Sequence, residues 1–345
     1  MRKALSIAAA AAGAALLVRR LIPRGNLRGR VVLVTGGSRG LGLVLARQLV
    51  RKGARVAICA RDDAELQRAH DDPSAHGGEV LTVPCDLRIP SAAERLVEMV
   101  VARYGRLDVV VNNAGIIEVG PERTMTLADY QTVMGVNFWG AVHVTLAALP
   151  HLRRSSSGRI VNITSIGGVM PVPHLLPYTC AKFALVGFSE GLATELERDG
   201  VRVTTVVPGL LRTGSYVNAL FKGKRADEVS WFSLGGALPG VSLSAERAAR
   251  RIILACERGE RFVTLGFPAK VMRLAHSLAP GLVIAALARI DRLLPGADGA
   301  DPGEAAEPGW LHRRGVARSP LVALADRAAR RNLEIPPLPP TPSSQ

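Results

Sequence analysis

The sequence is poor in aromatic residues and in cysteine for a chain of 345 residues. Phe, Trp and Tyr make up 4% of it although 48% is hydrophobic, so Ala, Val and Leu supply most of the apolar surface. The four cysteines lie far apart and form no CxxC pair and no cluster with histidine: Cys59, Cys85, Cys180 and Cys256. This spacing argues against a metal site and a disulfide framework, and it predicts reduced, structural thiols.

Acidic residues are absent from the first 30 positions, which hold seven lysines and arginines. The net charge is +15, and residues 241–295 add nine basic against four acidic residues. Both basic stretches are apolar and lack the interleaved aromatic residues that suit a nucleic-acid surface. We therefore expect no nucleic-acid partner and favour an anionic membrane surface.

An uncharged run from Ala4 to Val18 lies between two pairs of basic residues. As a helix it would rise roughly 22 Å, short of the ~30 Å hydrocarbon core unless flanking residues extend it. Three interpretations of this run stay open: a membrane anchor that spans the bilayer or dips into it, a cleaved signal peptide, and an Ala-rich helix that lies on the protein. We favour an anchor, with the catalytic domain on the cytoplasmic side of the membrane; without an anchor the protein would be cytoplasmic.

Short β-rich runs alternate with amphipathic stretches from residue 31 onward. The predicted strands are Val31–Thr35, Arg55–Cys59, Val80–Pro84, Asp108–Asn112, Arg159–Thr164, Arg202–Val207 and Arg261–Leu265. The predicted helices are Leu41–Lys52, Ser91–Tyr104, Leu127–Leu149, Tyr178–Arg198 and Ala245–Glu257. Because several strands are apolar along their whole length, this alternation predicts an α/β fold whose parallel sheet is covered on both faces.

Two regions interrupt this rhythm. Residues 214–240 form an insertion with four of the fourteen aromatic residues, and past Pro295 the composition shifts to Gly, Ala, Pro, Asp and Glu. We predict four parts: a hydrophobic N-terminal segment over 1–28, a dinucleotide-binding catalytic domain over 29–267, an apolar and basic helical extension over 268–295, and a tail over 296–345. The tail is expected to be largely disordered, with a short helix over 321–331.

The stretch VTGGSRGLG, residues 34–42, follows the first predicted strand and opens a helix. Backbone N–H groups at such a helix start form a phosphate site. The second strand leads to Arg61, where dinucleotide sites place the group that contacts the adenosine ribose. An acid there would accept from a free 2′-hydroxyl, whereas Arg61 and Arg39 would pair with a 2′-phosphate. NADP(H) is therefore favoured over NAD(H).

Further polar residues follow the later strands. Asp86 and Leu87 follow the third strand and Asn113 the fourth, at the sheet edge where open α/β folds bind ligands. In YTCAK, Tyr178 and Lys182 stand four residues apart and therefore share one helix face. Ser165 lies thirteen residues upstream, at the end of the fifth strand.

These motifs, in this order over residues 29–265, resemble the short-chain dehydrogenase/reductase family: TGGSRGLG, NNAG, Asn137 in VNFWG, Ser165, YTCAK, and Pro208-Gly209 with Thr213. The resemblance implies a three-layer, doubly wound Rossmann fold with a parallel seven-stranded sheet, and a homodimer or homotetramer. The cofactor-binding residues it implies are Gly36, Ser38, Arg39, Gly40, Leu41, Arg61, Asp86, Leu87, Asn113, Gly115, Tyr178, Lys182, Pro208 and Thr213.

The resemblance also implies catalytic roles. Tyr178 would donate a proton to a carbonyl oxygen, Lys182 would favour its phenolate, Ser165 would hold the substrate oxygen, and Asn137 would anchor a water. We predict interconversion of a carbonyl and an alcohol by hydride transfer. The aromatic insertion favours a hydrophobic, lipid-, retinoid- or steroid-like substrate. The alternative is a non-catalytic NADP-binding sensor or a membrane-surface scaffold on the same fold.

Overall fold

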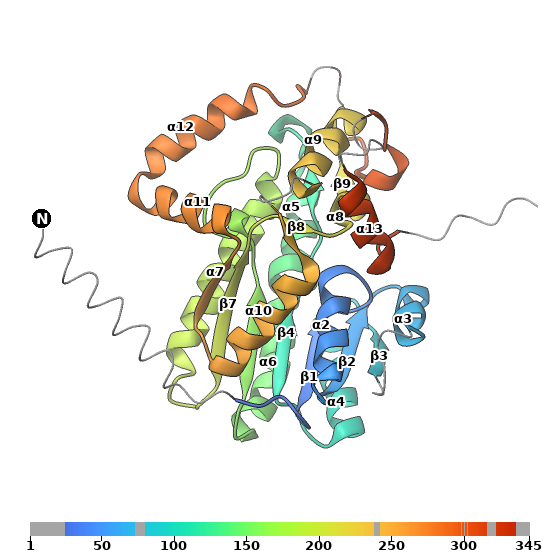
Figure 1. The fold of residues 1–345 in the computed structure, drawn as a ribbon, viewed down its shortest axis with the longest axis vertical. Coiled ribbons are helices and arrows are strands. Elements are labelled where there is room, and N and C mark those ends of the chain that lie inside the picture. The colour runs from blue at the N-terminus through green and yellow to red at the C-terminus, as the bar shows by residue number, and fades with distance from the viewer. Residues whose placement is uncertain are drawn as a thin grey trace, which may run out of the picture.

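The structure, a computed structural model, describes residues 25–72, 80–237, 242–297, 299, 301, 303–315 and 322–335. At its centre lies a parallel seven-stranded sheet in the order β11-β7-β6-β4-β1-β2-β3 (Figure 1). Its strands are β1 Val31–Thr35, β2 Arg55–Ala60, β3 Val80–Pro84, β4 Val109–Asn112, β6 Arg159–Ile163, β7 Arg202–Pro208 and β11 Phe262–Leu265. The predicted Rossmann-type sheet is confirmed, and its chain order reverses between β1 and β4, where such folds bind ligands.

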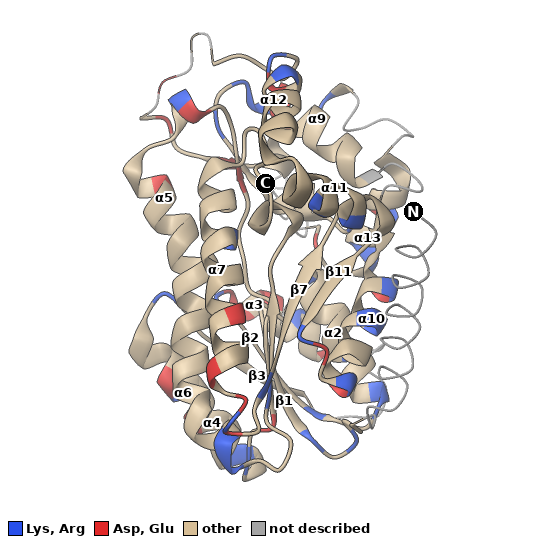
Figure 2. Ribbon diagram, turned by 90° about the vertical axis from the view of Figure 1, so that its left-hand side faces the viewer, with Lys and Arg blue, Asp and Glu red and all other residues tan. Residues whose placement is uncertain are grey.

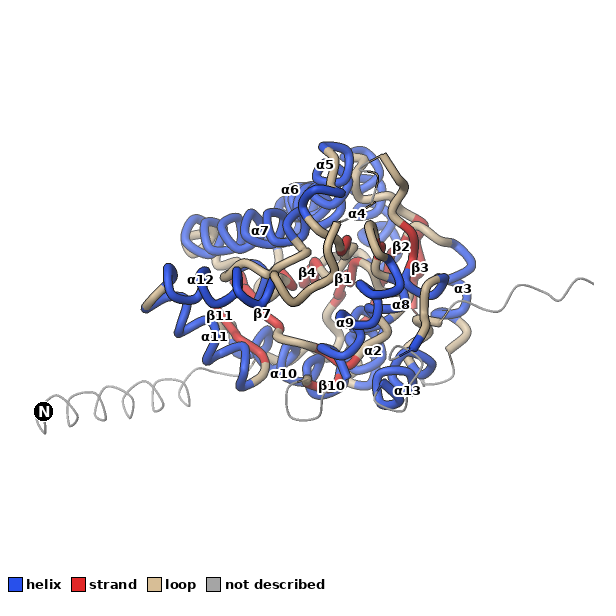
Figure 3. Tube along the Cα trace, turned by 90° about the horizontal axis from the view of Figure 1, so that it is seen from above, coloured by secondary structure: helices blue, strands red, loops and turns tan. Residues whose placement is uncertain are grey.

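Helices cover both faces of this sheet (Figure 3). The larger ones are α2 Gly40–Arg51, α4 Pro90–Tyr104, α6 Gly140–Arg154, α7 Leu176–Glu195 and α10 Ala245–Arg258. The helices α4, α6 and α7 lie on one face, whereas α2 and α10 lie on the other. The remaining elements are α3 Asp63–His70, β5 Glu118–Val119, η2 Glu122–Thr124, α5 Leu127–Met134, η3 Gly135–Trp139, η4 Ile166–Gly168, β8 Leu211–Arg212, α8 Ser215–Asn218, β9 Leu220–Phe221, α9 Arg225–Ala237, β10 Leu243–Ser244, α11 Phe267–Leu278, α12 Pro280–Asp291, β12 Glu307–Pro308, η5 Gly309–Leu311 and α13 Ala323–Arg331.

The strand β1 shows why uniformly apolar runs form the centre. All five of its residues are buried. Val32 and Val34 enter the core beneath α2 and α10, whereas Val31 and Leu33 enter the core beneath α4 and α6. Side chains of a strand alternate between the two faces, so a strand with helices on both sides must be apolar at every position.

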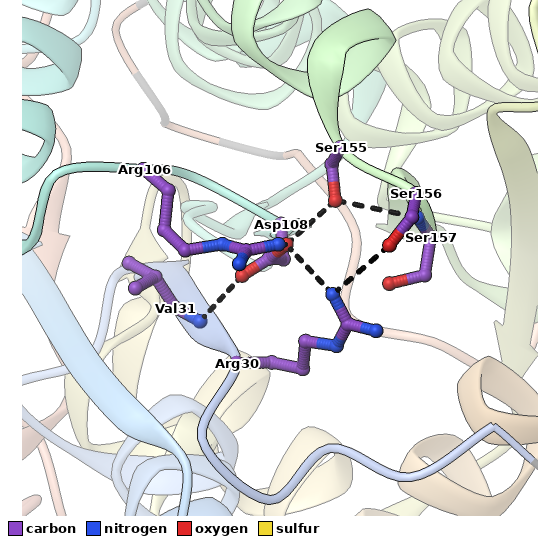
Figure 4. A network of polar contacts seen from close by, with 7 residues as sticks. All are labelled: Arg30, Val31, Arg106, Asp108, Ser155, Ser156 and Ser157. Atoms are coloured by element: carbon purple, nitrogen blue, oxygen red, sulfur yellow. Dashed lines mark hydrogen bonds and ion pairs between the residues drawn. The ribbon is translucent and has the colours of Figure 1, made fainter.

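A polar network ties the amino ends of β1 and β4 together, at the edge opposite the glycine turn (Figure 4). The fully buried Asp108 carboxylate accepts hydrogen bonds from the Val31 N–H at 3.0 Å and the Ser155 hydroxyl at 2.6 Å, and it pairs with Arg30 and Arg106. Burial alone would raise the pKa of Asp108, but these partners outweigh burial and lower that pKa. The network is a structural clamp.

The described part of the tail differs from the expected disorder. Val322 and Ala325 pack with Tyr216 and Val217 in a small buried cluster, and β12 pairs with β9. The Tyr216 hydroxyl also bonds the Asp326 carboxylate, which accepts from Arg313 at 2.8 Å. These polar contacts order a segment whose composition contains too little apolar surface to predict a fold. Residues 336–345 lie outside the described residues.

Within the described ranges, one helical stretch is long and apolar enough to cross a membrane: Leu127–Arg154, which joins α5, η3 and α6. Half of its most apolar window is buried inside the protein. Since α6 also supplies residues to the core beneath the sheet, this stretch is a core helix. Residues 1–24 of the predicted N-terminal segment 1–28 lie outside the described residues, and the anchor stays a prediction.

Candidate active site

The glycine turn joins β1 to α2 at the carboxyl edge of the sheet. Gly36 has φ +62°, and a Cβ built there would lie 2.8 Å from Ala114 Cα. A Cβ built on Gly42 would lie 2.1 Å from the Gly36 carbonyl oxygen. The amide of Asn113 donates to the Thr35 and Gly36 carbonyls at 3.0 and 3.1 Å, so it joins the ends of β1 and β4. This cradle fits the pyrophosphate of a dinucleotide, because such sites need close backbone approach at the first and third glycines.

The adenosine side of the cradle is more elaborate than the sequence suggested. The Ser38 hydroxyl donates to Glu65 Oε2 at 2.9 Å, and Arg39 pairs with the same carboxylate. Arg61 lies just after β2, and its charge helps to lower the pKa of Asp86, after the larger effect of the Arg88 hydrogen bond. Arg61 and Asp86 are thus neighbours, and Glu65 is a further polar group that sequence reasoning missed.

A contact with α6 holds the backbone at Leu87, a residue that we expect to lie beside the adenine. Leu87 is buried, and its carbonyl contacts His143 Nδ1 at 2.9 Å. At the opposite end of the site Pro208 closes β7 in register with Leu265, and the buried Thr213 follows β8. The residues expected to contact the two ends of a dinucleotide therefore lie along one edge of the sheet.

Tyr178 and Lys182 lie one turn apart in α7, as predicted from their spacing. The Lys182 ammonium is 5.6 Å from the centre of the Tyr178 ring and donates to the Ile163 carbonyl at 3.1 Å. Ser165 follows β6, and its hydroxyl accepts from the Gly167 N–H at 3.1 Å. A Cβ built on Gly167 would lie 3.6 Å from Ser165 Oγ and 3.5 Å from Tyr178 Cε1, so the two side chains face the same place. Three groups from two different elements therefore meet near the loop after β4, which contacts the glycine turn at Gly36.

Asn137 approaches the same place from the other side. It lies in η3, a single π-helical turn between α5 and α6, and such turns are frequent at functional sites. Its side chain accepts from the Ile116 N–H at 2.8 Å and donates to the Ile116 carbonyl at 2.9 Å. A Cβ built on Gly115 would lie 3.0 Å from Asn137 Oδ1 and 3.6 Å from Lys182 Nζ. Gly115 therefore keeps open the space that Asn137 and Lys182 face.

Burial dominates the electrostatics of this cluster. It raises the pKa of Tyr178, which the Ser165 hydrogen bond partly offsets, and it lowers the pKa of Lys182 to about 8. The resemblance implies an ammonium that favours phenolate, yet in the protein alone burial shifts the pKa of each group toward its neutral form. The reason is that desolvation disfavours either charge in the interior.

An apolar wall stands next to the Tyr178 ring. Buried Leu175 and Phe221 form its centre, with Trp231 and Phe232 of α9 packed against them. The rings of Phe221 and Phe232 are 5.8 Å apart, and those of Trp231 and Phe232 are 5.7 Å apart. Three of the four aromatic residues of the insertion thus gather beside Tyr178.

The wall also contains a polar pair that sequence reasoning did not find. His174 contacts the buried Glu228 carboxylate at 2.8 Å, and the Trp231 indole donates to Glu228 as well. His174 has φ +60°, a conformation that non-glycine residues rarely adopt. No local sequence signal links His174 to Glu228, because 54 positions separate them. The pair joins α9 to the segment before Tyr178.

The chain is similar to a known protein family and to several curated proteins. The family description "short chain dehydrogenase" matches residues 30–220. The 11-beta-hydroxysteroid dehydrogenase A of Sesamum indicum is 34% identical over 245 residues, which are 69% of this chain and 69% of that protein. A putative ketoacyl reductase of Streptomyces coelicolor is 41% identical over 187 residues, 53% of this chain and 71% of that protein.

Solved structures give the same result. A short-chain dehydrogenase from Streptomyces avermitilis superposes with a TM-score of 0.66 at 29% identity, covering 76% of this chain and 98% of that one. The L-sorbose reductase of Gluconobacter frateurii, solved with NADPH and L-sorbose, has a TM-score of 0.63 at 26% identity and covers 70% of this chain and 96% of its own.

Proposed function

Because the chain belongs to the short-chain dehydrogenase/reductase family and is an oxidoreductase of carbonyls and alcohols, we propose that it uses NADP(H) on a hydrophobic substrate at a membrane surface. The observation that carries this proposal is the meeting of Tyr178, Ser165 and Lys182 at the edge where the glycine turn opens. A bound nicotinamide supplies or accepts the hydride, and the side chains handle the proton and the developing charge.

Tyr178 is the proposed proton donor for reduction. When the C=O π bond breaks, the carbon gains the hydride and the oxygen gains the phenolic proton. Ser165, whose hydroxyl lies beside the Tyr178 ring, would donate to the same oxygen and stabilise its negative charge. Lys182 lies close enough to attract the phenolate that remains, and Asn137 faces the space beside Lys182 through which a water could return the proton.

The preference for NADP(H) rests on the cations at the adenosine end. Arg39 is partly compensated by Glu65, whereas Arg61 is an exposed residue at the end of β2. A 2′-phosphate placed there would gain a charge-assisted hydrogen bond from Arg61. The G. frateurii reductase supports this assignment, since it was solved with NADPH.

The hydrophobic substrate class rests on the wall of Leu175, Phe221, Trp231 and Phe232 beside Tyr178. Burying an apolar substrate against such a wall is favourable by about 25 cal/mol per Å² of apolar area. The S. indicum relative, whose name refers to a hydroxysteroid, fits the same class. Rates with long-chain or polycyclic ketones should therefore exceed rates with small polar ones.

Membrane association rests on α11 and α12. Phe267, Leu278 and Leu282 are 78%, 76% and 75% exposed, and α12 buries none of its residues. Figure 2 shows basic positions in blue on α11, beside the largely tan α12. Apolar side chains accompanied by Lys and Arg are typical of helices that lie in an anionic membrane interface. We place the catalytic domain on the cytoplasmic side.

The experiment that tests catalysis is the substitution Tyr178→Phe. It removes the proton donor and keeps the ring, so kcat should fall by at least about 10³-fold while NADPH affinity changes less than about twofold. The assay follows NADPH oxidation with a hydrophobic ketone. Tyr130→Phe, which removes a hydroxyl from α5, is the matched control and should keep its turnover. Retention of activity in Tyr178→Phe would contradict the mechanism and favour a non-catalytic role.

A further inference from the structure

The C-terminal segment 322–335 crosses the glycine turn. In Figure 1, α13 lies beside α2, and Figure 3 shows the same neighbours from above. The Gly40 N–H donates to the Asn332 carbonyl at 2.9 Å. Arg47 of α2 donates to the Arg331 carbonyl at 3.0 Å and to Asn332 Oδ1 at 3.3 Å. Segment 322–335 is therefore bound to α2, whose N-terminus forms part of the phosphate cradle.

Glu334 extends from this segment into the cradle itself. Its Oε2 accepts from the Gly214 N–H at 2.6 Å, and a Cβ built on Gly40 would lie 2.9 Å from its Oε1. Gly40 is the second of the three glycines, where a missing side chain lets the backbone approach the pyrophosphate. A carboxylate thus stands where the glycine pattern reserves room for a phosphate.

The two groups cannot share this place. N–H groups at the start of α2 are the donors that a dinucleotide phosphate needs, and the Asn332 carbonyl already takes the one at Gly40. We propose that segment 322–335 is an autoinhibitory clasp, whose Asn332 carbonyl and Glu334 carboxylate occupy part of the pyrophosphate cradle and must withdraw before the dinucleotide binds. This inference rests on the proposed NADP(H)-dependent function.

Favourable contacts hold the clasp closed. Ala325, Ala328 and Ala329 are buried, so α13 approaches its neighbours closely through small side chains. Arg331 also pairs with Glu246 at 2.5 Å, on α10. Most of the hydrogen bonds and ion pairs of the segment are made to α2, α10 and the region after β7 rather than to the central strands, which suits a segment that can detach without disturbing the sheet.

Three other features oppose docking. Leu333 has φ +55°, a strained conformation for a residue with a side chain. Among the described residues, the Asn332 side-chain nitrogen is buried without a hydrogen-bond partner. Burial also raises the pKa of Glu334 to about 8, although the Gly214 N–H and the Arg39 charge act in the opposite direction. The closed clasp therefore stores strain that its release would relieve.

The test measures NADPH affinity in the full chain and in released variants, without a turnover assay. Three variants release the clasp: a chain ending at residue 321, Glu334→Ala, and Ala329→Arg, whose long side chain has no room because Ala329 is fully buried. Each should bind NADPH several-fold more tightly, up to about tenfold if a tenth of the protein is open at rest. Arg327→Ala, on the exposed face of α13, is the control and should leave the Kd unchanged.

Weaker binding in the variants would show that the segment forms part of the cofactor site, and equal binding would show that it does not compete; either result overturns the clasp. Hydrogen exchange of the full chain gives a second measurement. Saturating NADPH should speed exchange of the amides of 322–335, and protection there would contradict the proposal. If NADPH binds neither the full chain nor any variant, the proposed function fails as well, so the two failures are distinguishable.

Discussion

The segments α11–α12 and α13 both follow β11, the last strand of the central sheet, and both carry basic residues, yet their environments are opposite. The twelve-residue α12 buries no residue, whereas the nine-residue α13 buries three alanines. Large apolar side chains such as Leu282 are exposed to solvent. By contrast, Asp326 and Arg331 of α13 form polar contacts with Arg313 and Glu246. Small side chains and polar contacts therefore attach α13 to the protein. The more apolar α11–α12 segment stays exposed and can bind a different partner.

The sharpest way to break this comparison is to make the junction of α11 and α12 polar. The double substitution Leu278→Asp and Leu282→Asp removes two exposed leucines, each worth about 1.5–3 kcal/mol when buried. Binding to anionic vesicles should fall by about 100-fold or more. Sedimentation with vesicles measures it, in a chain that begins at Gly25 so that the expected anchor cannot mask the effect.

The matched control is Leu324→Asp, which changes an exposed leucine of α13. It should leave vesicle binding as it was, because α13 already faces the protein. Equal loss in both variants, or no loss in the α11–α12 variant, would remove the distinction between the two segments.

A second test concerns the basic residues. We expect those of α11–α12 to bind anionic lipids and those near α13 to bind a cofactor phosphate. Arg61→Asp replaces the cation after β2 with a group that accepts from a ribose hydroxyl. The ratio of kcat/KM with NADPH to that with NADH should fall by about 10- to 100-fold, as expected for loss of a charge-assisted hydrogen bond. Arg292→Asp, just after α12, should not alter this ratio; an unchanged ratio in Arg61→Asp would mean that the 2′-phosphate lies elsewhere.

The sheet and its edge were predictable because their signals are local. Uniformly apolar strands, the glycine turn at Gly36 and the four-residue spacing of Tyr178 and Lys182 each follow from backbone geometry within a few residues. The seven predicted strands agree with the structure to within two residues at each end. Cofactor preference and the catalytic roles remain predictions, since they depend on groups that bind to the protein.

The features that the sequence did not predict depend on contacts between residues that lie far apart in the chain. The contact of Glu334 with Gly214 spans 120 positions and involves one backbone N–H, which leaves no trace in composition. The residues around α13 were expected to be disordered because they are polar and rich in Gly and Pro. Polar anchors such as the bond from Tyr216 to Asp326 order them, and such anchors require the fold to exist first.

The smallest expected effect concerns two buried titratable residues, Glu334 in the clasp and Lys182 in α7, and their contributions to the free energy of unfolding. Burial lowers the pKa of Lys182 from 10.5 to about 8, so the protonated amine destabilises the folded state. This cost is fully present below pH 8, shrinks as pH rises, and vanishes above the unfolded pKa of 10.5. Lys182→Met should therefore lose turnover and yet raise the free energy of unfolding at pH 7.

The expected gain is about 1–3 kcal/mol at pH 7, reduced by the hydrogen bond to the Ile163 carbonyl that the variant loses. Urea unfolding at pH 7, 9 and 10.5 measures it, and the difference from the wild type should shrink at each step. Glu334→Ala, by contrast, should leave global unfolding nearly unchanged, because the clasp can open without the sheet. A Lys182→Met protein that is less stable at pH 7, or whose difference ignores pH, would show that the ammonium is well solvated in its site.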